Sequence, residues 1–422
     1  LRSMTFEPEE SEKWYEVLKE YVQHMDRQDA EYKRVRGLQS YLEIGLPHRG
    51  TAGLIQKIPA VYKLLKSKSL VSPEMSVTSN LPSLLRGGKN FSEWVPKDKV
   101  LYNTIRIPVE MVLGRYGVGL AADELMAVYG SQEGLAHIGW TMCDPGDVVL
   151  VPDPGYPIFE LGPYLCGADC VHYPLLSENN YLPDLEHFDE ELAEKARFMV
   201  VSYPANPLGV AAPDEFYAQL IAFAKKHHIV IIHDNAYSDI IFDGRIGKSF
   251  LAFEGAKEVG VEFNSLSKTY NLTGARVSFV LGNREIVGAF KRLRSQIDYG
   301  MFLPIQHAAA AALNGPQDSV ERNRESYQAR RDALCGGLRS IGWQVPDSQG
   351  SMFVWAPLPA GYTDSVEFCF ELLDRTGLLC TPGSAFGALG EGHVRFALVR
   401  PVPVMKEIVS AVKASGILEG RT

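Results

Sequence analysis

The sequence predicts an α/β protein with a large, mainly parallel sheet, helices on both faces of that sheet, and a smaller α+β domain. The first observation is that short apolar runs alternate with segments of helical periodicity from about residue 98 onward. The second is that polar residues and glycines directly follow several of these runs, as at a ligand site built on strand ends. The third is a change after Phe290 to long helical segments and shorter strands, which indicates a second domain.

Apolar runs define the strands that we expect in the large sheet. They lie at 124–129, 147–151, 171–174, 197–202, 229–233, 261–263 and 277–281. Helices are expected between most of them, for example at 214–227, and a further helix at 99–116 stops before Gly117. This alternation is typical of a parallel sheet, because each connection between parallel strands has to cross over a face of the sheet.

The pattern also predicts how the chain divides into domains. Residues 1–44 form a helical N-terminal segment that belongs to the small domain or to a dimer arm, 45–300 form the large domain, and 301–422 form the small domain. Within the large domain, residues 48–97 are irregular and rich in Gly and Pro. The segments expected in the last part of the chain are helices at 284–298, 303–313, 317–340, 364–376 and 402–414 and strands at 351–355 and 393–399.

Composition places the chain among ordinary globular proteins. It has 422 residues, of which 46% are hydrophobic and 22% charged, and its net charge is −9. This acidic balance argues against nucleic acid as a partner, and no apolar run is long enough to cross a membrane. The first residues lack a secretory pattern, and the six cysteines form no metal set with nearby histidines. We therefore expect a cytoplasmic protein without a metal site.

The segment Ser265–Arg276 contains the centre of the expected site. Its Lys268 follows a buried strand end, where a lysine is uncommon unless it has a role. A desolvated lysine beside other cations can lose its proton near neutral pH and form a Schiff base with an aldehyde. Ser265 and Arg276 supply a hydroxyl and a guanidinium that suit a phosphate beside that aldehyde. These residues indicate pyridoxal phosphate (PLP) anchored on Lys268, whereas a solvated loop lysine is the alternative.

Polar residues after two other strands fit the same cofactor. Asp234 follows the apolar run 229–232, and a carboxylate at a buried strand end needs a partner such as a protonated pyridine nitrogen. Tyr237 is within reach of the ring hydroxyl, and Asn206 ends another strand with a side-chain amide that can form hydrogen bonds. On local evidence alone, Asp234 is also compatible with a helix N-cap and Asn206 with a turn asparagine.

Three further positions complete the expected site. In Gly130–Gly134, which follows a strand and opens a helix, backbone N–H groups favour an anion. Tyr156 lies in a turn shaped by Pro and Gly, where its ring stacks on a flat heterocycle or, alternatively, caps the core. Arg395 is an inward charge in the alternating strand 393–399, and it either binds a substrate carboxylate through two hydrogen bonds or forms a structural salt bridge.

With these motifs in this order, the chain resembles the class I/II aminotransferase family of fold type I PLP-dependent enzymes, in particular its group of LL-diaminopimelate, alanine and aspartate aminotransferases. The motifs are Gly130–Gly134, Asp153–Pro157, Asn206–Gly209, Asp234–Tyr237, Ser265–Arg276 and Val394–Phe396. The resemblance implies the transfer of an amino group between an α-amino acid and a 2-oxo acid. It also implies a homodimer with active sites at the subunit interface.

The resemblance further implies a role for each candidate residue. Lys268 holds the cofactor covalently and shuttles a proton, and Asp234 pairs with the pyridine nitrogen. Tyr237 and Asn206 form hydrogen bonds to the ring oxygen, and Tyr156 stacks on the ring. The other implied ligands are Ser131, Gln132, Ser265 and Arg276 for the phosphate, Arg395 for the α-carboxylate of the substrate, and Gly45 in the segment that closes over the substrate.

The chain departs from the family pattern between Gly45 and about Tyr102. The family has a shorter segment there, with a tyrosine that reaches the cofactor phosphate of the other subunit, whereas Trp94 is the nearest aromatic residue in this chain. We therefore expect residues 48–97 to influence substrate and outcome. The alternative activity is a PLP-dependent lyase or synthase on the same scaffold, because the cofactor supports elimination, replacement and carbon–carbon bond formation.

Overall fold

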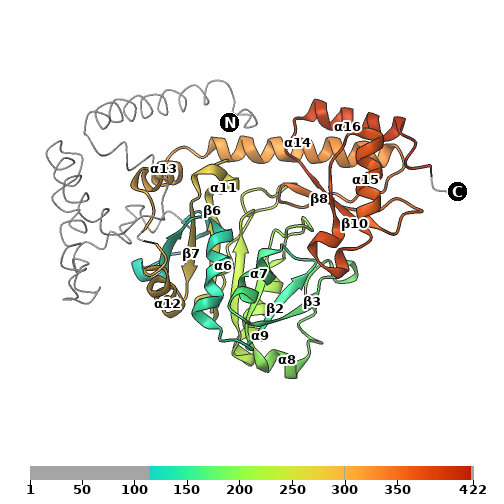
Figure 1. Cartoon of the computed structure of the whole chain (residues 1–422). Coiled ribbons are helices and arrows are strands. Elements are labelled where there is room, and N and C mark those ends of the chain that lie inside the picture. Colours follow the sequence, from blue (N-terminus) through green and yellow to red (C-terminus); the bar gives the residue numbers. More distant parts are fainter. Residues whose placement is uncertain (1–113, 299, 420–422) are drawn as a thin grey trace, which may run out of the picture. The chain divides into compact units, whose positions relative to one another are not determined.

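The computed structural model describes residues 114–298 and 300–419, which lie within one compact unit of the chain, residues 98–422 (Figure 1). The expectations for residues 1–44, for 48–97 and for most of the helix at 99–116 lie outside the described residues. At the end of that expected helix, Gly114–Tyr116 forms a short 3₁₀ helix, η2.

A seven-stranded sheet forms the centre of the structure. Its strands are β1 (Leu125–Val128), β2 (Val148–Asp153), β3 (Asp169–Pro174), β4 (Ala196–Ser202), β5 (Val230–Asn235), β6 (Gly260–Ser265) and β7 (Ser278–Gly282). Their spatial order is β1-β7-β6-β5-β4-β2-β3. All pairs from β3 to β6 are parallel, whereas β7 runs antiparallel to β6 and to β1. The expected large, mainly parallel sheet is confirmed.

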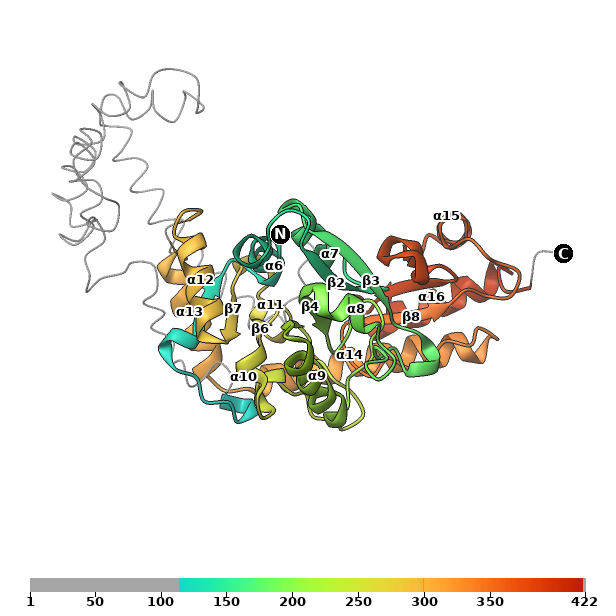
Figure 2. The same cartoon turned by 90° about the horizontal axis from the view of Figure 1, so that it is seen from below.

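Helices cover both faces of this sheet, with α6 and α7 on one side and α9 on the other (Figure 2). The covering helices are α6 (Ser131–Met142), α7 (Ile158–Leu165), α9 (Asp214–His227), α12 (Arg284–Arg294) and α13 (Leu303–Asn314). Consecutive residues of β5 explain why both faces need cover, since Ile231 joins the α9 cluster and Ile232 the α6 cluster. Burying each of these side chains contributes about 1.5–3 kcal/mol to stability.

The last part of the described chain builds a second, smaller sheet. The elements are α14 (Asp318–Ser340), β8 (Phe353–Pro357), α15 (Ser365–Thr376), β9 (Thr381–Pro382), β10 (His393–Ala397) and α16 (Val402–Ala414). The strands are antiparallel in the order β8-β10-β9. Trp343 and Phe368 meet edge to face in the core of this part, with ring centroids 5.5 Å apart. The expected helices at 317–340, 364–376 and 402–414 agree closely with α14, α15 and α16.

Two elements differ from the sequence pattern for identifiable reasons. The strand expected at 351–355 begins only at Phe353, because Ser351 has a φ of 69° that is incompatible with a strand. Helix α7 was not identified individually, since its Gly162 and Pro163 weaken a helical pattern. Pro163 is nevertheless buried inside the helix, where α7 packs against α6.

Neither a membrane crossing nor a metal cluster is found in residues 114–298 and 300–419. None of the helices there combines the length and the apolar character that a bilayer crossing requires. The same residues include no group of three or more His, Cys, Asp or Glu side chains suited to hold a metal ion. The six cysteines are all thiols outside disulfides.

Candidate active site

The carboxyl ends of three neighbouring parallel strands place several candidate residues along one edge of the sheet. Strand β4 ends at Ser202, β5 at Asn235 and β6 at Ser265. Ser202 lies in register with Asp234 on β5, and Lys268 follows three residues after the end of β6. The chain therefore presents Asp234 and Lys268 at the edge where parallel sheets bind their ligands.

Lys268 lies in a short helix, α11 (Leu266–Thr269), directly after β6. Ser265 caps this helix, because its Oγ accepts a hydrogen bond of 3.1 Å from the backbone N–H of Ser267. The lysine is partly buried, and burial followed by the nearby Arg276 guanidinium holds its pKa below the usual value. A lysine of this kind is a better nucleophile and proton carrier than an exposed one.

Asp234 is a buried carboxylate inside β5, with 7% of its surface exposed. Burial, reinforced by the charge of Glu262, raises the pKa of Asp234 to about 7. Its Oδ1 has no hydrogen-bond partner among the described residues. No helix begins at Asp234, so the N-cap alternative is wrong. A buried acceptor left without a donor fits the protonated pyridine nitrogen of PLP.

Two candidate tyrosines, Tyr237 and Tyr156, lie near enough to Asp234 for its charge to raise their pKa values. Tyr237 is buried, and its pKa is raised by burial and then by the charge of Asp234. Tyr156 donates a hydrogen bond of 3.0 Å from its hydroxyl to Gln132 Oε1. The pKa of Tyr156 is raised by burial and by Asp234, whereas the Arg395 and Arg276 guanidinium groups oppose that rise. Tyr156 therefore lies within electrostatic range of Asp234, Arg276 and Arg395, which come from three other segments of the chain.

A candidate phosphate site lies where the N-terminus of α6 meets Arg276. The Arg276 Nη2 donates to the backbone carbonyl of Tyr129 at 3.1 Å, and Nη1 donates to that of Thr273 at 2.9 Å. Gly130 has a φ of 95°, and a Cβ there would lie 2.1 Å from Arg276 Nη2. Only glycine therefore allows this approach without displacement of the guanidinium. A helix N-terminus beside a fixed arginine is well suited to hold an anion.

Two serine hydroxyls complete this region. Ser131 opens α6, is buried, and has an Oγ without a hydrogen-bond partner among the described residues. Ser265 Oγ accepts from Ser278 Oγ at 2.9 Å in addition to its role as a helix cap. Its own O–H can still donate to a phosphate oxygen, since a hydroxyl carries one donor and two lone pairs. The unsatisfied Ser131 hydroxyl fits a bound phosphate in the same way.

Arg395 on β10 contacts the segment that follows β4. Its Nη1 donates to Asn206 Oδ1 at 2.9 Å, and its Nη2 donates to Thr381 Oγ1 at 3.4 Å. Burial lowers the pKa of this guanidinium, and its Nε has no hydrogen-bond partner in the part of the chain that the structure describes. No carboxylate in that part pairs with it, so the structural salt bridge is wrong there. The Asn206 Oδ1 accepts this bond, and its Nδ2 is the group that can donate to a cofactor oxygen.

Two aromatic rings that contact Arg395 were not predicted from the sequence. Its guanidinium carbon lies 4.0 Å from the centroid of Phe353 and 4.5 Å from that of Phe386. Such contacts restrict the plane of the guanidinium and favour its charge. No spacing links these three residues in the sequence, because Phe353 lies on β8 and Phe386 ends a separate 3₁₀ helix, η7 (Gly383–Phe386).

Gly45, the remaining candidate, lies outside the described residues. Of the candidates within them, Ser131, Gln132, Tyr156, Asn206, Asp234, Tyr237, Ser265, Lys268, Arg276 and Arg395 are all placed by the structure. Charge interactions relate Lys268 and Tyr156 to Arg276, whereas Tyr237, Asn206 and again Tyr156 interact with Arg395. This arrangement can hold a phosphate near Arg276 and a carboxylate near Arg395.

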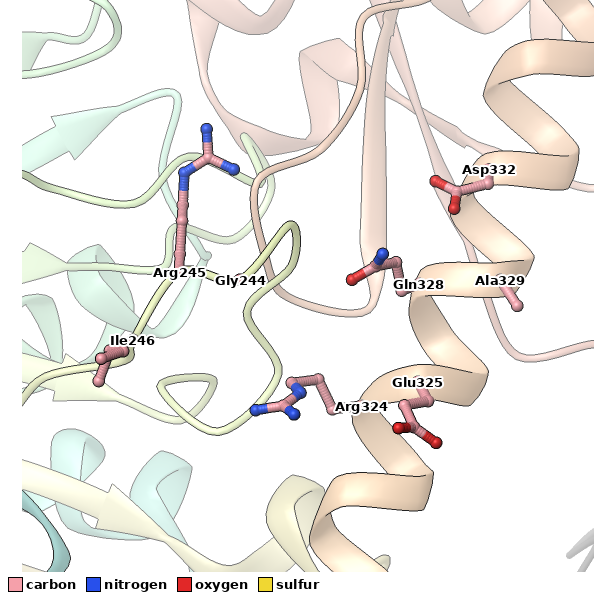
Figure 3. Close-up of a pocket in the computed structure, with 8 residues that line it drawn as sticks. All are labelled: Gly244, Arg245, Ile246, Arg324, Glu325, Gln328, Ala329 and Asp332. Carbon is pink, nitrogen blue, oxygen red and sulfur yellow. The ribbon is translucent and has the colours of Figure 1, made fainter.

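A separate cleft of about 390 Å³ lies between α14 and the loop after β5 (Figure 3). Figure 3 shows Arg245 on the loop and Arg324 on the helix among its lining residues. Each of these arginines already has an acidic partner, Asp243 at 3.1 Å and Glu321 at 2.8 Å respectively. The cleft includes none of the candidate residues, and its paired charges indicate no ligand.

The fold and this arrangement of residues define a PLP-dependent enzyme of fold type I. The sequence model of the family described as aminotransferase class I and II matches residues 110–412. The LL-diaminopimelate aminotransferase of Halothermothrix orenii is 44% identical over 323 residues, 76% of this chain and 83% of that protein. The enzyme of the same name from Dehalococcoides mccartyi is 46% identical over 288 residues, 68% of this chain and 74% of that protein.

Solved structures agree with these sequence comparisons. The substrate-bound BacF structure from Bacillus subtilis has a TM-score of 0.72 and 36% identity, covering 75% of this chain and 80% of that one. A probable N-succinyldiaminopimelate aminotransferase from Thermus thermophilus has a TM-score of 0.71 and 31% identity, covering 82% and 92%. The chain belongs to the class I and II aminotransferase family. It is a PLP-dependent transferase that moves an amino group between an α-amino acid and a 2-oxo acid.

Proposed function

We propose that this aminotransferase uses LL-diaminopimelate as its amino substrate. The support is that several relatives sharing 39–46% identity with this chain are named LL-diaminopimelate aminotransferases. The observation that carries the site assignment is the partly buried Arg395, which lacks a carboxylate partner among the described residues and has a buried, unpaired Nε. A planar fork of donors in this state suits the α-carboxylate of an amino acid.

The proposed roles of the chain's own residues follow from their surroundings. When bound, PLP supplies an electron sink that makes the Cα proton of the substrate removable. Lys268, with its lowered pKa, holds the cofactor covalently and then takes that proton and returns it. Asp234 keeps a proton on the pyridine nitrogen, and Tyr237 and Asn206 orient the ring through its oxygen. Tyr156 supports the face of the ring.

The two ends of the site are proposed to grip the two anionic groups. Arg276 and the N-terminus of α6 hold the phosphate, with Ser131, Gln132 and Ser265 as further donors. Arg395 holds the substrate carboxylate at the other end. We also propose that the enzyme is a cytoplasmic homodimer with domains at 45–300 and 301–422, that residues 1–44 belong to the small domain or to a dimer arm, and that Gly45 borders the substrate.

The substrate assignment is tested by a half-reaction monitored through the colour of the cofactor. The loaded enzyme is mixed separately with LL-diaminopimelate, alanine, aspartate and an aromatic amino acid, and conversion of the bound aldehyde to the amine is followed. We expect LL-diaminopimelate to react with the highest kcat/KM. If another amino acid reacts more efficiently, the substrate assignment fails although transamination stands.

The divergent segment 48–97 is proposed to recognise the distal part of the substrate. It lies outside the described residues, and the proposal rests on its Arg49, Arg86 and Trp94, which offer charge and a stacking face. Each of the three is replaced by alanine, and the variants are screened with the same amino acids. We expect at least one variant to change the substrate profile. Unchanged profiles in all three would assign the segment a structural role only.

A further inference from the structure

The carboxylate of Asp153 connects the large sheet with the part of the chain that carries Arg395. Asp153 is the last residue of β2 and is buried, with 6% of its surface exposed. Its Oδ1 and Oδ2 lie 3.1 and 3.3 Å from the backbone N–H of Leu389, which donates to them. Leu389 belongs to a short 3₁₀ helix, η8 (Ala388–Gly390). A buried carboxylate thus binds the start of a turn more than 200 residues away in the chain.

The turn is shaped around this carboxylate. Gly387, immediately before η8, has a φ of 124°, and a Cβ there would lie 2.0 Å from Asp153 Oδ1. A side chain at this position would meet both a disfavoured backbone conformation and the carboxylate itself. Close approach of Asp153 therefore requires glycine at position 387, and the two residues form one contact.

A second contact runs beside the first. The backbone N–H of Gly155 donates to the carbonyl of Phe386 at 2.7 Å. Gly155 directly precedes Tyr156, the proposed ring-stacking residue, and Phe386 covers the guanidinium of Arg395 at 4.5 Å. Residues 153–156 therefore carry the cofactor-facing tyrosine on one side and hold the aromatic cover of the substrate-facing arginine on the other.

We propose that Asp153 is a positioning residue that sets the orientation of Arg395 through the Gly387–Leu389 turn and the Phe386 ring. This inference rests on the proposed role of Arg395 as the ligand of the substrate carboxylate. In this role Asp153 acts through the turn and the ring rather than by contact with substrate or cofactor. Removing its carboxylate leaves the Leu389 N–H without its acceptor and releases the turn that presents Phe386. The guanidinium then loses part of its fixed orientation, and a misplaced fork forms weaker bonds to a carboxylate.

The experiment compares Asp153→Ala and Asp153→Asn in the loaded enzyme with the parent. The measurements are kcat, KM, the melting temperature, and the Kd of 2-oxoglutarate from calorimetry. For Asp153→Ala we expect KM and Kd to rise about tenfold, the equivalent of a lost hydrogen bond to a charged group, while kcat stays within about twofold. Asp153→Asn retains one acceptor oxygen and should show a smaller rise. Gly387→Ala should resemble Asp153→Ala.

The matched control is Asp147→Ala. Asp147 directly precedes Val148, the first residue of β2, whereas Asp153 is its last residue. Asp147 accepts from the backbone N–H of Asp144 at 2.9 Å and pairs with Arg197, away from the turn at 387–389. This variant should lower the melting temperature without changing KM or Kd. If the Asp153 variants behave in the same way, or if kcat alone falls, Asp153 is structural and the inference is overturned.

Arg395→Lys is measured in parallel to separate this inference from the proposed function. If Arg395→Lys weakens 2-oxoglutarate binding and both Asp153 variants do not, only the positioning role fails. If Arg395→Lys leaves Kd and KM unchanged, the assignment of Arg395 fails and the positioning role fails with it. Weaker binding in Arg395→Lys, Asp153→Ala and Gly387→Ala, with normal binding in Asp147→Ala, supports both.

Discussion

Two buried carboxylates on neighbouring strands differ in how far the protein satisfies them. Glu262 on β6 accepts hydrogen bonds from Asn235 Nδ2 at 3.0 Å, Ser249 Oγ at 2.9 Å and the backbone N–H of Phe250 at 2.8 Å. Asp234 on β5 has an Oδ1 with no such partner among the described residues, and burial raises its pKa to about 7. The chain therefore supplies the hydrogen-bond donors for Glu262, whereas the free oxygen of Asp234 is suited to a ligand.

The same contrast separates two arginines, the buried Arg331 and the partly buried Arg395. Arg331 of α14 forms two hydrogen bonds to Asp243, at 2.6 and 2.8 Å, and a third to the carbonyl of Ser348 at 2.8 Å. Arg395 forms one to an amide and one to a hydroxyl, and no carboxylate in residues 114–298 and 300–419 pairs with it. In these two pairs, Glu262 and Arg331 find their partners within the chain, whereas Asp234 and Arg395 keep polar atoms that can bind a ligand.

Lys268→Ala should have the largest effect. Loss of the covalent anchor and proton carrier is expected to lower kcat by about 10⁴-fold, the upper range for acid–base groups. The control is Lys257→Ala, which loses an ion pair of 2.8 Å with Glu124 and should keep its activity. Reduction with borohydride followed by peptide mapping should place the cofactor on Lys268 in the parent. An adduct on another lysine, or normal turnover in the variant, would contradict the assignment.

The two carboxylates should respond in opposite ways to neutral isosteres. Asp234→Asn is expected to lower kcat by about 10³-fold, because a charge that stabilises the transition state is removed, with little loss of stability. Glu262→Gln should instead lower the free energy of unfolding by about 1–3 kcal/mol and keep most of the activity. Single-turnover kinetics and urea unfolding of both variants check this. A loss of activity in Glu262→Gln together with a loss of stability alone in Asp234→Asn would contradict the roles assigned to the two carboxylates.

The two arginines provide a similar test of smaller size. Arg395→Lys is expected to lower kcat/KM about 100-fold, because an ammonium group cannot reproduce the planar fork. Arg331→Lys should leave kcat/KM nearly unchanged and destabilise the contact between α14 and the loop that carries Asp243. Steady-state kinetics and thermal unfolding distinguish the two. Equal kinetic losses in both variants would mean that Arg395 has no special role.

The pH dependence of the cofactor-free protein should show the smallest effect. Since burial raises the pKa of Asp234 to about 7, the folded chain binds its proton more tightly than the unfolded chain does. Its contribution to stability is therefore complete below about pH 4 and is lost as the pH rises to about 7. Urea unfolding at pH 5 and pH 8 should show an extra loss of the order of 2 kcal/mol in the parent.

Asp234→Asn is the reference for this measurement, because it lacks the titrating group and retains Asp153, whose pKa burial also raises. The difference between parent and variant isolates the contribution of Asp234. Binding of PLP should abolish that difference, since a cationic ring nitrogen favours the charged carboxylate. A parent whose stability has the same pH slope as the variant would show that Asp234 is not perturbed.

Local patterns in the sequence determined most of the secondary structure. Runs such as 229–233 alternate with helices such as 214–227 because backbone pairing and side-chain periodicity act over a few residues, and both segments appear close to the expected bounds. Residues at or shortly after strand ends, among them Asp234 and Lys268, were predicted as site candidates for the same reason, since parallel strands align their ends. The residues themselves also indicated PLP before any geometry was considered.

Tertiary structure alone decided the contacts between segments that are distant in the chain. The reversal of β7 within the sheet, the rings of Phe353 and Phe386 on Arg395, and the bond from Leu389 to Asp153 have no local signature. The structure also excludes the N-cap alternative for Asp234, which the local pattern left open, because the chain continues in β5 and no helix begins at this residue. These outcomes depend on long-range packing, which no window of a few residues contains.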